Sequence, residues 1–282
     1  MKATLAGGQQ QHMAQPGDPA GATSAPPPPL SAPEAGPEWG KGTRDPSERK
    51  FLDGPRPRGR ELGQAINIFW QCMRGFRALH FVGPCVTVFG SARFREGHPY
   101  YVLTREVGAR LANEGFTVMT GGGPGLMEAA NRGAKEAGGY SVGANIELPH
   151  EQEPNAYLDR WVEFRYFFVR KLMLVKYSYA FVAMPGGFGT LDEIFETAVL
   201  VQTGKIKQFP LVLLGVSYWQ PLIDFIRNRL IAETTIDPMD LERWIVTDSP
   251  REAGDLIRER ALGQFGLKYR PAPKARRLLG ER

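Results

Sequence analysis

Cysteine and histidine are scarce in this chain, which has two cysteines and four histidines among its 282 residues. The spacing of Cys72 and Cys85 fits no metal-ligand pattern, and the scattered histidines form no HxH or HExxH pair. We therefore expect no metal site, and we interpret the cysteines as two buried thiols in a reducing compartment. No apolar run approaches a membrane span, and the N-terminus lacks the apolar core of a secretory signal. These absences predict a soluble, cytoplasmic protein without a membrane partner.

Positive charge is in excess only at the ends of the chain. The formal net charge is +5, of which residues 1–60 contribute +2 and residues 268–282 contribute +5, so that 61–267 stands at about −2. A protein that binds nucleic acid needs a basic groove rather than a basic tail. We therefore expect no nucleic-acid partner, and we interpret 268–282 as a solvated tail.

Residues 1–60 differ in composition from the rest of the chain. They hold 11 of the 23 prolines, including a run of four at 26–29, together with many Gly, Ala, Ser and Gln residues. Such a segment buries too little apolar surface to offset its ordering entropy, so we expect a disordered leader. The globular domain should then span 61–267 and begin with an amphipathic N-terminal helix over 61–80.

From residue 85 onward, short apolar runs rich in β-branched residues alternate with helical patterns. Because two parallel strands must be joined by a crossover connection, this alternation predicts βαβ units and a mainly parallel sheet with helices on both faces. The expected fold class is α/β, doubly wound and Rossmann-like, with ligands beyond the carboxyl ends of the strands. The expected strands are 86–90, 117–120, 141–146, 164–168, 180–184, 210–214 and 244–247, and the expected helices are 100–113, 124–137, 169–177, 191–203, 218–230 and 250–262.

The loop FGSAR at 89–93 follows the first expected strand. Its small residues let a ligand approach the backbone, and Ser91 offers a hydroxyl for hydrogen bonding. A plain tight turn explains the same letters equally well.

The loop TGGGPGLMEAAN at 120–131 follows the second expected strand. Gly121, Gly122 and Gly123 precede a helix whose free N–H groups and partial positive charge suit an anion. The glycines break the GxGxxG spacing of dinucleotide-binding proteins. We therefore expect a small phosphate ester here rather than NAD.

The loop PGGFGTLDE at 185–193 follows the strand expected at 180–184. It exposes the backbone amides of three glycines, Gly186, Gly187 and Gly189. With the Thr190 hydroxyl beside them, these amides suit a phosphate. The letters also fit a capping box, in which Glu193 only bonds back to the start of its helix at Thr190. The local pattern supports the two interpretations equally.

A basic pair, Arg170 and Lys171, stands 15 positions before Pro185 at the start of a helical run. The guanidinium of Arg170 is suited to bidentate pairing with a phosphate or a carboxylate. An ordinary exposed basic pair is the other interpretation, and the local pattern alone favours it.

Together, these four segments resemble the LOG (Lonely Guy) family of cytokinin-activating phosphoribohydrolases, long labelled lysine decarboxylase-like. PGGFGTLDE matches the family's PGGxGTxxE, GGGPGLMEAAN matches its GGGxxGLM segment, FGSAR resembles its first-strand loop, and the basic pair stands at the family's distance. The resemblance covers about residues 85–265. It departs at Tyr179, where aspartate is common, and at Asp192, which replaces a frequent glutamate.

The resemblance implies hydrolysis of the N-glycosidic bond of a nucleoside 5′-monophosphate, of the AMP or cytokinin riboside type, to free base and ribose 5-phosphate. Arg170 and Glu193 correspond to the family's catalytic pair, and Ser91, Lys171 and the glycine loops to its nucleotide-binding groups. A homodimer or higher homo-oligomer is implied, and no cofactor. Cleavage develops positive charge on the ribose, and the Glu193 carboxylate can stabilise this charge. Arg170 would keep that carboxylate ionised and oriented.

Two alternatives stay open. A nucleotide or molybdenum-cofactor carrier on the same scaffold would bind without turnover, because a fold does not settle function. Such a carrier would not require the pair Arg170 and Glu193. A DNA-processing protein of a related Rossmann type is the other alternative, and the acidic balance of 61–267 argues against it.

Overall fold

The computed structural model describes residues 54, 57–147, 153–206 and 209–265. Every described residue belongs to one compact unit of the chain, which spans 43–282. Most of the leader expected over 1–60, and the whole tail expected over 268–282, lie outside the described residues. The described residues thus make up the α/β domain.

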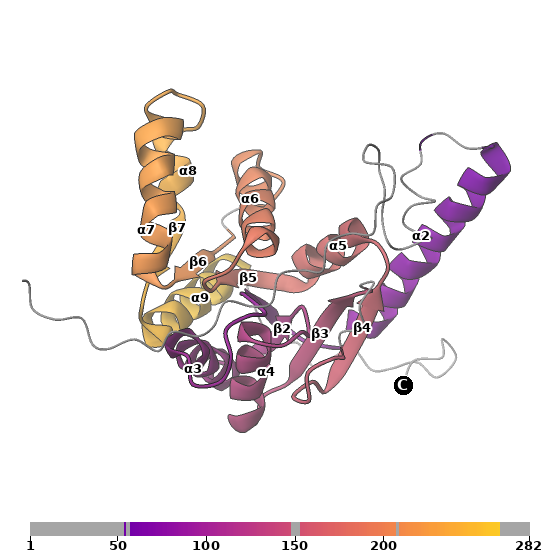
Figure 1. The fold of residues 1–282 in the computed structure, drawn as a ribbon, viewed down its shortest axis with the longest axis horizontal. Helices are drawn as coiled ribbons and strands as arrows, with labels where there is room; N and C mark the ends of the chain where they lie inside the picture. The colour runs from indigo at the N-terminus through magenta and orange to yellow at the C-terminus, as the bar shows by residue number, and fades with distance from the viewer. Residues whose placement is uncertain (1–53, 55–56, 148–152, 207–208, 266–282) are drawn as a thin grey trace, which may run out of the picture. The chain divides into compact units, whose positions relative to one another are not determined.

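Seven parallel strands form one sheet, in the order β4-β3-β2-β1-β5-β6-β7 (Figure 1). The strands are β1 (Cys85–Phe89), β2 (Thr117–Thr120), β3 (Ser141–Ile146), β4 (Arg160–Phe164), β5 (Ser178–Ala183), β6 (Leu211–Leu214) and β7 (Trp244–Thr247). The central strands are buried on both faces, as an all-parallel sheet between two helical layers requires. The predicted fold class, a doubly wound α/β fold of Rossmann type, is confirmed.

Helices cover both faces of the sheet (Figure 1). They are α2 (Arg58–Leu79), α3 (Pro99–Asn113), α4 (Leu126–Glu136), α5 (Phe167–Tyr177), α6 (Phe188–Gln202), α7 (Val216–Phe225), α8 (Pro238–Glu242) and α9 (Pro250–Phe265), and a π-helical turn, η1 (Ile226–Ile231), continues α7. Alternate side chains of β1 enter two separate cores. Val86 and Val88 pack with α3, α4 and α9, whereas Cys85 and Phe89 pack with α2, α5, α6 and α7.

The strand order reverses between β1 and β5. β1 pairs with β2 on one side and with β5 on the other, so the chain leaves the carboxyl ends of these neighbours toward opposite halves of the sheet. Ligands of doubly wound folds bind in the crevice at such a switch point. The three unusual loops follow β1, β2 and β5 and therefore share this edge of the sheet, as the sequence predicts.

The structure corrects several element boundaries. The strand predicted at 164–168 lies earlier, at Arg160–Phe164, and Phe167 and Phe168 begin α5 instead. Burial alternates along this strand because it lies at the edge of the sheet, so no continuous apolar run marks it. α2 begins at Arg58, three residues before the predicted domain start at 61. The helix predicted at 218–230 corresponds to α7 and the π-helical turn η1 that continues it, whereas α8 has no counterpart among the predicted elements.

Cys85 is buried and Cys72 is half-buried, and both are free thiols. Among the described residues, no group of three His, Cys, Asp or Glu side chains is placed to hold a metal ion. A search of the same residues finds no helix with the length and apolarity needed to cross a membrane.

Candidate functional site

Backbone hydrogen bonds tie the three strand-end loops together. The Ser91 amide donates to the Pro185 carbonyl at 3.0 Å, and the Ser91 carbonyl accepts from the Leu126 amide at 3.0 Å. Ser91 thereby joins the loop after β1 to the loop after β5 and to the start of α4. Its hydroxyl accepts a bond from the Arg93 amide at 3.1 Å, which closes a tight turn. Because an accepting hydroxyl still has a proton to donate, Ser91 remains a candidate contact for a ligand.

Two glycines permit this close approach of the loops. A Cβ on Gly90 would lie 2.8 Å from the Cβ of Leu126, and a Cβ on Gly125 would lie 2.6 Å from the Ser91 carbonyl oxygen. Gly125 also has a φ of 70°, a conformation that favours glycine. The glycine pattern alone did not mark Gly125 as a site residue, although its position one residue before α4 is that of a helix-entry glycine.

A buried polar network holds the glycine loop at 120–131, which follows β2 and which we call the second glycine loop. The Thr120 hydroxyl donates to Oδ1 of Asn131 at 2.6 Å and accepts from the Gly122 amide at 2.9 Å. Nδ2 of Asn155 donates to the Gly123 carbonyl at 3.1 Å from the other side. The Gly122 amide, which the sequence predicts as a contact for an anion, is thus engaged within the protein, and this bond shapes the loop. Asn131 and Asn155 were missed because a buried amide looks like any polar residue in the sequence.

Arg170 extends from α5 across the second glycine loop. Its Nε donates to the Ala144 carbonyl of β3 at 2.8 Å. A Cβ on Gly121 would lie 2.9 Å from Nη2 of Arg170, so glycine leaves the room that the guanidinium occupies. Only 13% of the Arg170 side chain is exposed. The structure therefore rejects the interpretation of Arg170 as an ordinary exposed basic residue.

Glu193 lies in the second turn of α6. This helix begins at Phe188, its N-cap is Gly187, and no side chain caps it by a hydrogen bond. Thr190 is therefore already within the helix, and Glu193 lies too far along it to reach back to the N-cap. The capping-box interpretation is wrong for this helix. Glu193 is instead 2% exposed and faces the interior at the carboxyl ends of the strands.

Arg170 and Glu193 face each other across a loose gap. Nη1 of Arg170 lies 3.8 Å from Oε1 of Glu193. Oε2 of Glu193 is buried and has no hydrogen-bond partner in the described part of the chain. Most buried polar atoms in proteins are hydrogen-bonded, so an orphaned carboxylate oxygen requires an explanation. Its position beside a largely buried guanidinium, at the switch point, makes it a candidate contact for a ligand.

Burial controls the charge state of this pair. It raises the pKa of Glu193 to about 7, although the nearby charges of Arg170 and Lys171 act to lower it. Desolvation likewise lowers the pKa of Arg170, against the attraction of Glu193. The sequence predicts that Arg170 keeps the carboxylate ionised, but the Coulomb attraction is outweighed by desolvation. The result is a carboxyl group that titrates near neutral pH, the range that suits proton transfer.

The glycine loop at 185–193, which follows β5 and which we call the third glycine loop, is open, whereas the second glycine loop is closed. Gly187 and Gly189 are exposed, and nothing lies within 4 Å of a Cβ built on either. Gly186 is buried against Thr190, whose Oγ1 would lie 2.1 Å from a Cβ at that position. The N-terminus of α6 is therefore accessible, and its amide groups and partial positive charge suit an anion.

Lys171 pairs with α6. Its Nζ lies 2.7 Å from Oδ2 of Asp192 and 3.1 Å from Oε2 of Glu196. Desolvation lowers the pKa of Lys171, but the attraction of these two carboxylates outweighs it and raises the pKa. An ammonium neutralised in this way is a poor phosphate ligand. Lys171 therefore ties α5 to α6 beside Arg170 and Glu193, and its role as a phosphate contact stays a prediction.

The chain is similar in sequence to known proteins. A family model described as "Possible lysine decarboxylase" matches residues 127–257. The chain is 31% identical over 160 residues to the cytokinin riboside 5′-monophosphate phosphoribohydrolase of Mycobacterium tuberculosis, which covers 54% of this chain and 81% of that protein. It is 30% identical over 164 residues to the corresponding enzyme LOG1 of Arabidopsis thaliana, with coverages of 55% and 71%.

Solved structures with a similar fold include two proteins of molybdenum cofactor metabolism. The molybdenum cofactor binding protein of Rippkaea orientalis is 23% identical with a TM-score of 0.46, over 63% of this chain and 96% of that one. The molybdenum cofactor carrier protein of Chlamydomonas reinhardtii is 24% identical with a TM-score of 0.46, over 63% and 97%. Likeness at this level does not bear on the activity of this chain.

Fold and site define a Rossmann-like protein with a buried arginine–glutamate pair and an open helix N-terminus at its switch point. The match to the mycobacterial phosphoribohydrolase covers most of that protein at more than 30% identity. This chain belongs to the LOG family, whose family model is described as possible lysine decarboxylase.

Proposed function

We propose that this protein is a hydrolase that cleaves the N-glycosidic bond of a nucleoside 5′-monophosphate, of the AMP or cytokinin riboside type, to free base and ribose 5-phosphate. One observation carries the proposal. The Glu193 carboxyl group is buried beside Arg170, and its Oε2 has no partner in the described part of the chain. The names of the related enzymes of Mycobacterium tuberculosis and Arabidopsis thaliana support the same activity.

The 5′-phosphate is assigned to the open N-terminus of α6. Gly187 and Gly189 leave space there, and the helix amides and dipole favour a dianion. The phosphate is remote from the bond that breaks, so its binding energy is available to position the ribose. The Ser91 hydroxyl, in the neighbouring loop, is a further candidate contact to the nucleotide.

The reacting bond is assigned to the space beside Glu193. As the bond between C1′ and the base nitrogen lengthens, positive charge develops on the ribose ring, and a carboxylate stabilises it. Water adds to C1′ and gives up a proton, which the Glu193 carboxylate accepts, while the base leaves with the bonding electron pair and takes up a proton. A pKa of about 7 leaves a large ionised fraction of Glu193 at neutral pH. Arg170 orients the carboxylate and limits its protonation.

The test is a substrate panel with the purified protein. AMP, GMP, a cytokinin riboside 5′-monophosphate and the matching free nucleosides are incubated with it, and free base is measured by chromatography. We expect the monophosphates to be cleaved far faster than the nucleosides, because only they bear the phosphate. Equal rates on adenosine and AMP would refute the phosphate assignment. Tight binding of a monophosphate without release of base from any substrate would identify a carrier instead.

A further inference from the structure

Donors on both sides of the third glycine loop hold two of its carbonyl groups. β5, which precedes the loop, lies between β1 and β6 in the sheet. On the β1 side, the Ser91 amide donates to the Pro185 carbonyl at 3.0 Å. On the β6 side, the Tyr218 hydroxyl donates to the Gly186 carbonyl at 2.9 Å. The second of these bonds comes from a side chain, so a substitution can remove it.

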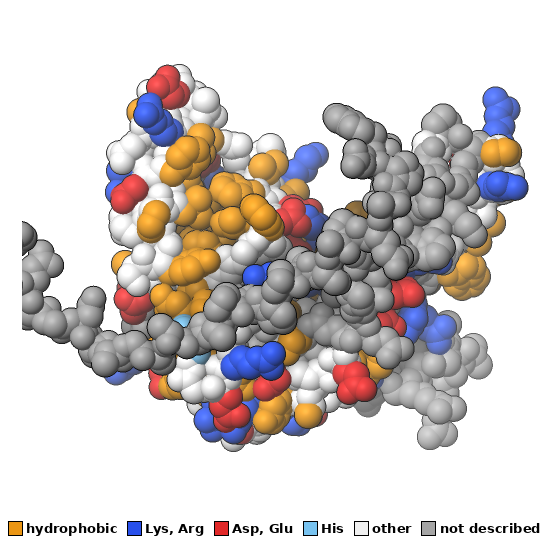
Figure 2. Space-filling view, viewed as in Figure 1, with side chains coloured by type: hydrophobic (Ala, Val, Ile, Leu, Met, Phe, Trp, Pro, Cys, Tyr) orange, Lys and Arg blue, Asp and Glu red, His pale blue; other side chains and the backbone are white. Residues whose placement is uncertain are grey.

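Tyr218 stands on α7, on a face where hydrophobic side chains gather over α6 and α7 (Figure 2). The exposed large apolar side chains of the two helices include Phe188, Phe225 and Tyr218. A phenylalanine ring would cover such a face as well as a tyrosine ring does. The hydroxyl of Tyr218 therefore requires a separate explanation, and its bond to the Gly186 carbonyl supplies one.

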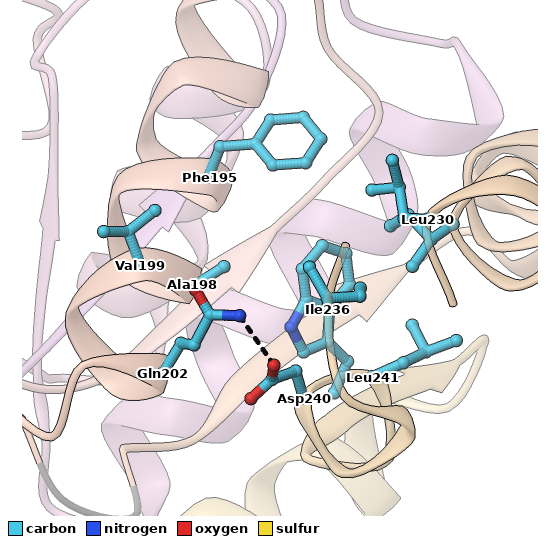
Figure 3. Close-up of a pocket in the computed structure, with 10 residues that line it drawn as sticks. Phe195, Ala198, Val199, Gln202, Leu230, Ile236, Asp240 and Leu241 are labelled. Carbon is cyan, nitrogen blue, oxygen red and sulfur yellow. Dashed lines mark hydrogen bonds between the residues drawn. The ribbon is translucent and has the colours of Figure 1, made fainter. Parts of the chain in front are cut away.

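The apolar pocket between α6 and η1 does not account for Tyr218 either (Figure 3). The walls of this pocket include Phe195 and Val199 of α6 and Leu230 of η1. Tyr218 is not among the residues that line it. The position of Tyr218 is thus explained by the third glycine loop and not by the pocket.

Packing fixes the Tyr218 ring in the place that this bond requires. The ring lies edge-to-face with Tyr100 at a centroid distance of 6.2 Å and with Trp219 at 5.0 Å. Gly215, which joins β6 to α7, has a φ of 99°, and a Cβ on it would lie 3.0 Å from Cγ of Pro185. The start of α7 is therefore set directly against the third glycine loop.

The bond from Tyr218 decides which way one amide faces. In a trans peptide unit the carbonyl and the following N–H point in opposite directions, and the unit between Gly186 and Gly187 is trans. Because the Gly186 carbonyl turns toward α7, the Gly187 N–H turns away from α7, toward the side of the loop on which Ser91 lies. Gly187 is the N-cap of α6, and none of the described residues accepts a hydrogen bond from its N–H. This amide is available to an anion.

Glycine on both sides makes the reverse orientation of this peptide unit accessible. Gly186 and Gly187 lack the Cβ that restricts other residues, so the unit can turn over at little steric cost. Without the Tyr218 hydroxyl the Gly186 carbonyl loses its partner, and a reversed unit would aim this oxygen at the anion site. A carbonyl oxygen repels a phosphate, whereas an N–H donates to it. Tyr218 thus has the means to set phosphate affinity without touching the phosphate.

We propose that Tyr218 is a positioning residue for the 5′-phosphate. It holds the Gly186 carbonyl toward α7 and thereby holds the Gly187 N–H toward the bound phosphate. The inference rests on the proposed function only where that function assigns the phosphate to the N-terminus of α6. It depends neither on the base that is released nor on hydrolysis itself.

The first test compares two tyrosines whose hydroxyls donate to backbone carbonyls. Tyr218→Phe removes the bond to Gly186, and Tyr177→Phe removes a bond of 3.3 Å to Phe76 at the opposite edge of the sheet, where β5 begins. Calorimetry measures the Kd of ribose 5-phosphate. Tyr218→Phe should raise this Kd about tenfold, as expected for one misdirected hydrogen bond to a charged group, and Tyr177→Phe should leave it unchanged. The proposal is overturned if Tyr218→Phe binds as wild type does, if both variants lose affinity equally, or if wild type does not bind ribose 5-phosphate.

A second variant separates the hydroxyl of Tyr218 from its ring. Tyr218→Leu removes both, so wild-type affinity in Tyr218→Phe with a loss only in Tyr218→Leu would assign the effect to ring packing and overturn the proposal. Where the protein releases base, the ratio of kcat/KM for AMP to kcat/KM for adenosine should fall about tenfold in Tyr218→Phe, because only AMP bears the phosphate.

The two measurements distinguish this proposal from the proposed hydrolase activity. Loss of ribose 5-phosphate affinity in Tyr218→Phe, in a protein that releases no base, would support the role of Tyr218 and refute the hydrolase. Normal base release together with unchanged affinity in Tyr218→Phe would refute the role of Tyr218 and support the hydrolase.

Discussion

Two groups of arginine and glutamate in this protein have similar composition but opposite electrostatics. Between α3 and α4, the Glu136 carboxylate lies 2.5 Å from Arg105 and 2.9 Å from Arg132, with all three side chains partly exposed. The hydrogen bond from Arg105 lowers the pKa of Glu136. At the strand ends, Arg170 and Glu193 are enclosed and 3.8 Å apart, and burial raises the pKa of Glu193 to about 7.

The contrast shows that burial and hydrogen bonding of the carboxylate, not the residue types in the pair, decide whether its pKa is raised or lowered. The exposed group is well paired and solvent screens its charges, so its presence needs no further explanation. The buried carboxyl group lacks a partner for one oxygen in the described part of the chain. Such a group opposes folding when ionised and is characteristic of functional sites. Matched substitutions in the two groups can test this distinction.

The largest effect is expected from removing the buried carboxylate. Glu193→Gln should lower the rate of base release by about 10³-fold, because the amide keeps the shape but neither accepts a proton nor stabilises positive charge. Nucleotide binding, measured by calorimetry with AMP, should remain. The control is Glu136→Gln, which removes a carboxylate of the exposed group and should leave turnover nearly normal. Normal turnover in Glu193→Gln would show that the buried group is not catalytic.

Replacing the buried guanidinium should have the next largest effect. Arg170→Ala should lower turnover by about 10²-fold and move the acid limb of the pH–rate profile upward, because the Glu193 pKa rises when the neighbouring charge is lost. Arg170→Lys should recover part of the pKa effect but not the orientation, since an ammonium lacks the planar fork. Lys171→Ala should be milder, and Arg132→Ala should be neutral. If Arg170→Ala has wild-type activity at every pH, Arg170 does not act together with Glu193 in catalysis.

The free energy of unfolding should depend on pH because the pKa of Glu193 is raised in the folded state. The pKa of Glu193 is about 7 in the folded state against 4.5 for the free group, so folding favours the protonated form. The contribution of Glu193 to the free energy of unfolding is complete below about pH 4.5 and is lost as pH rises through about 7. Relative to Glu193→Gln, wild type should lose up to about 3 kcal/mol of unfolding free energy between pH 5 and pH 8. Urea denaturation at both pH values measures this difference.

Glu136→Gln again supplies the comparison for that experiment. Its carboxyl has a lowered pKa, so its contribution is present above the unfolded pKa and is lost only as pH falls. Its difference from wild type should be flat between pH 5 and pH 8. A flat difference for Glu193→Gln as well would mean that the buried carboxyl titrates normally.

The smallest effect is expected at the open helix end. Gly189→Ala adds a methyl group where nothing lies within 4 Å, so it should raise the unfolding free energy by about 1 kcal/mol through helix propensity. The same methyl group intrudes on the assigned phosphate position, so KM for AMP should rise about tenfold. Gly63→Ala, at an equally open position in α2, should stabilise without changing KM. An unchanged KM in Gly189→Ala would place the phosphate elsewhere.

Some of this protein is visible in local patterns. The alternation of apolar runs with helical patterns predicts the parallel sheet, and the glycine spacing marks the loops after β1, β2 and β5, because both features depend on neighbours in sequence. The prediction fails at β4, whose burial alternates at the sheet edge. The ion pairs of Lys171 are likewise absent from the local pattern, since its carboxylate partners lie on another helix.

Local patterns could not decide whether Glu193 belongs to a capping box or to a functional site. The letters from Thr190 to Glu193 fit a capping box, but the helix begins at Phe188, and the Ser91 amide donates to the Pro185 carbonyl in the preceding loop. Where a helix begins depends on such tertiary contacts, which the letters do not contain.

The sequence by itself determined the α/β fold class, the three loops that meet at one edge of the sheet, and the candidacy of Arg170 and Glu193. Only the tertiary structure decided that the two side chains face each other, that the third loop is open while the Gly122 amide is engaged, and that an apolar face stands beside the site. It also reversed the expected charge balance of Glu193. The physical reason is that burial belongs to the packed whole, and desolvation acts only once distant segments have enclosed the group.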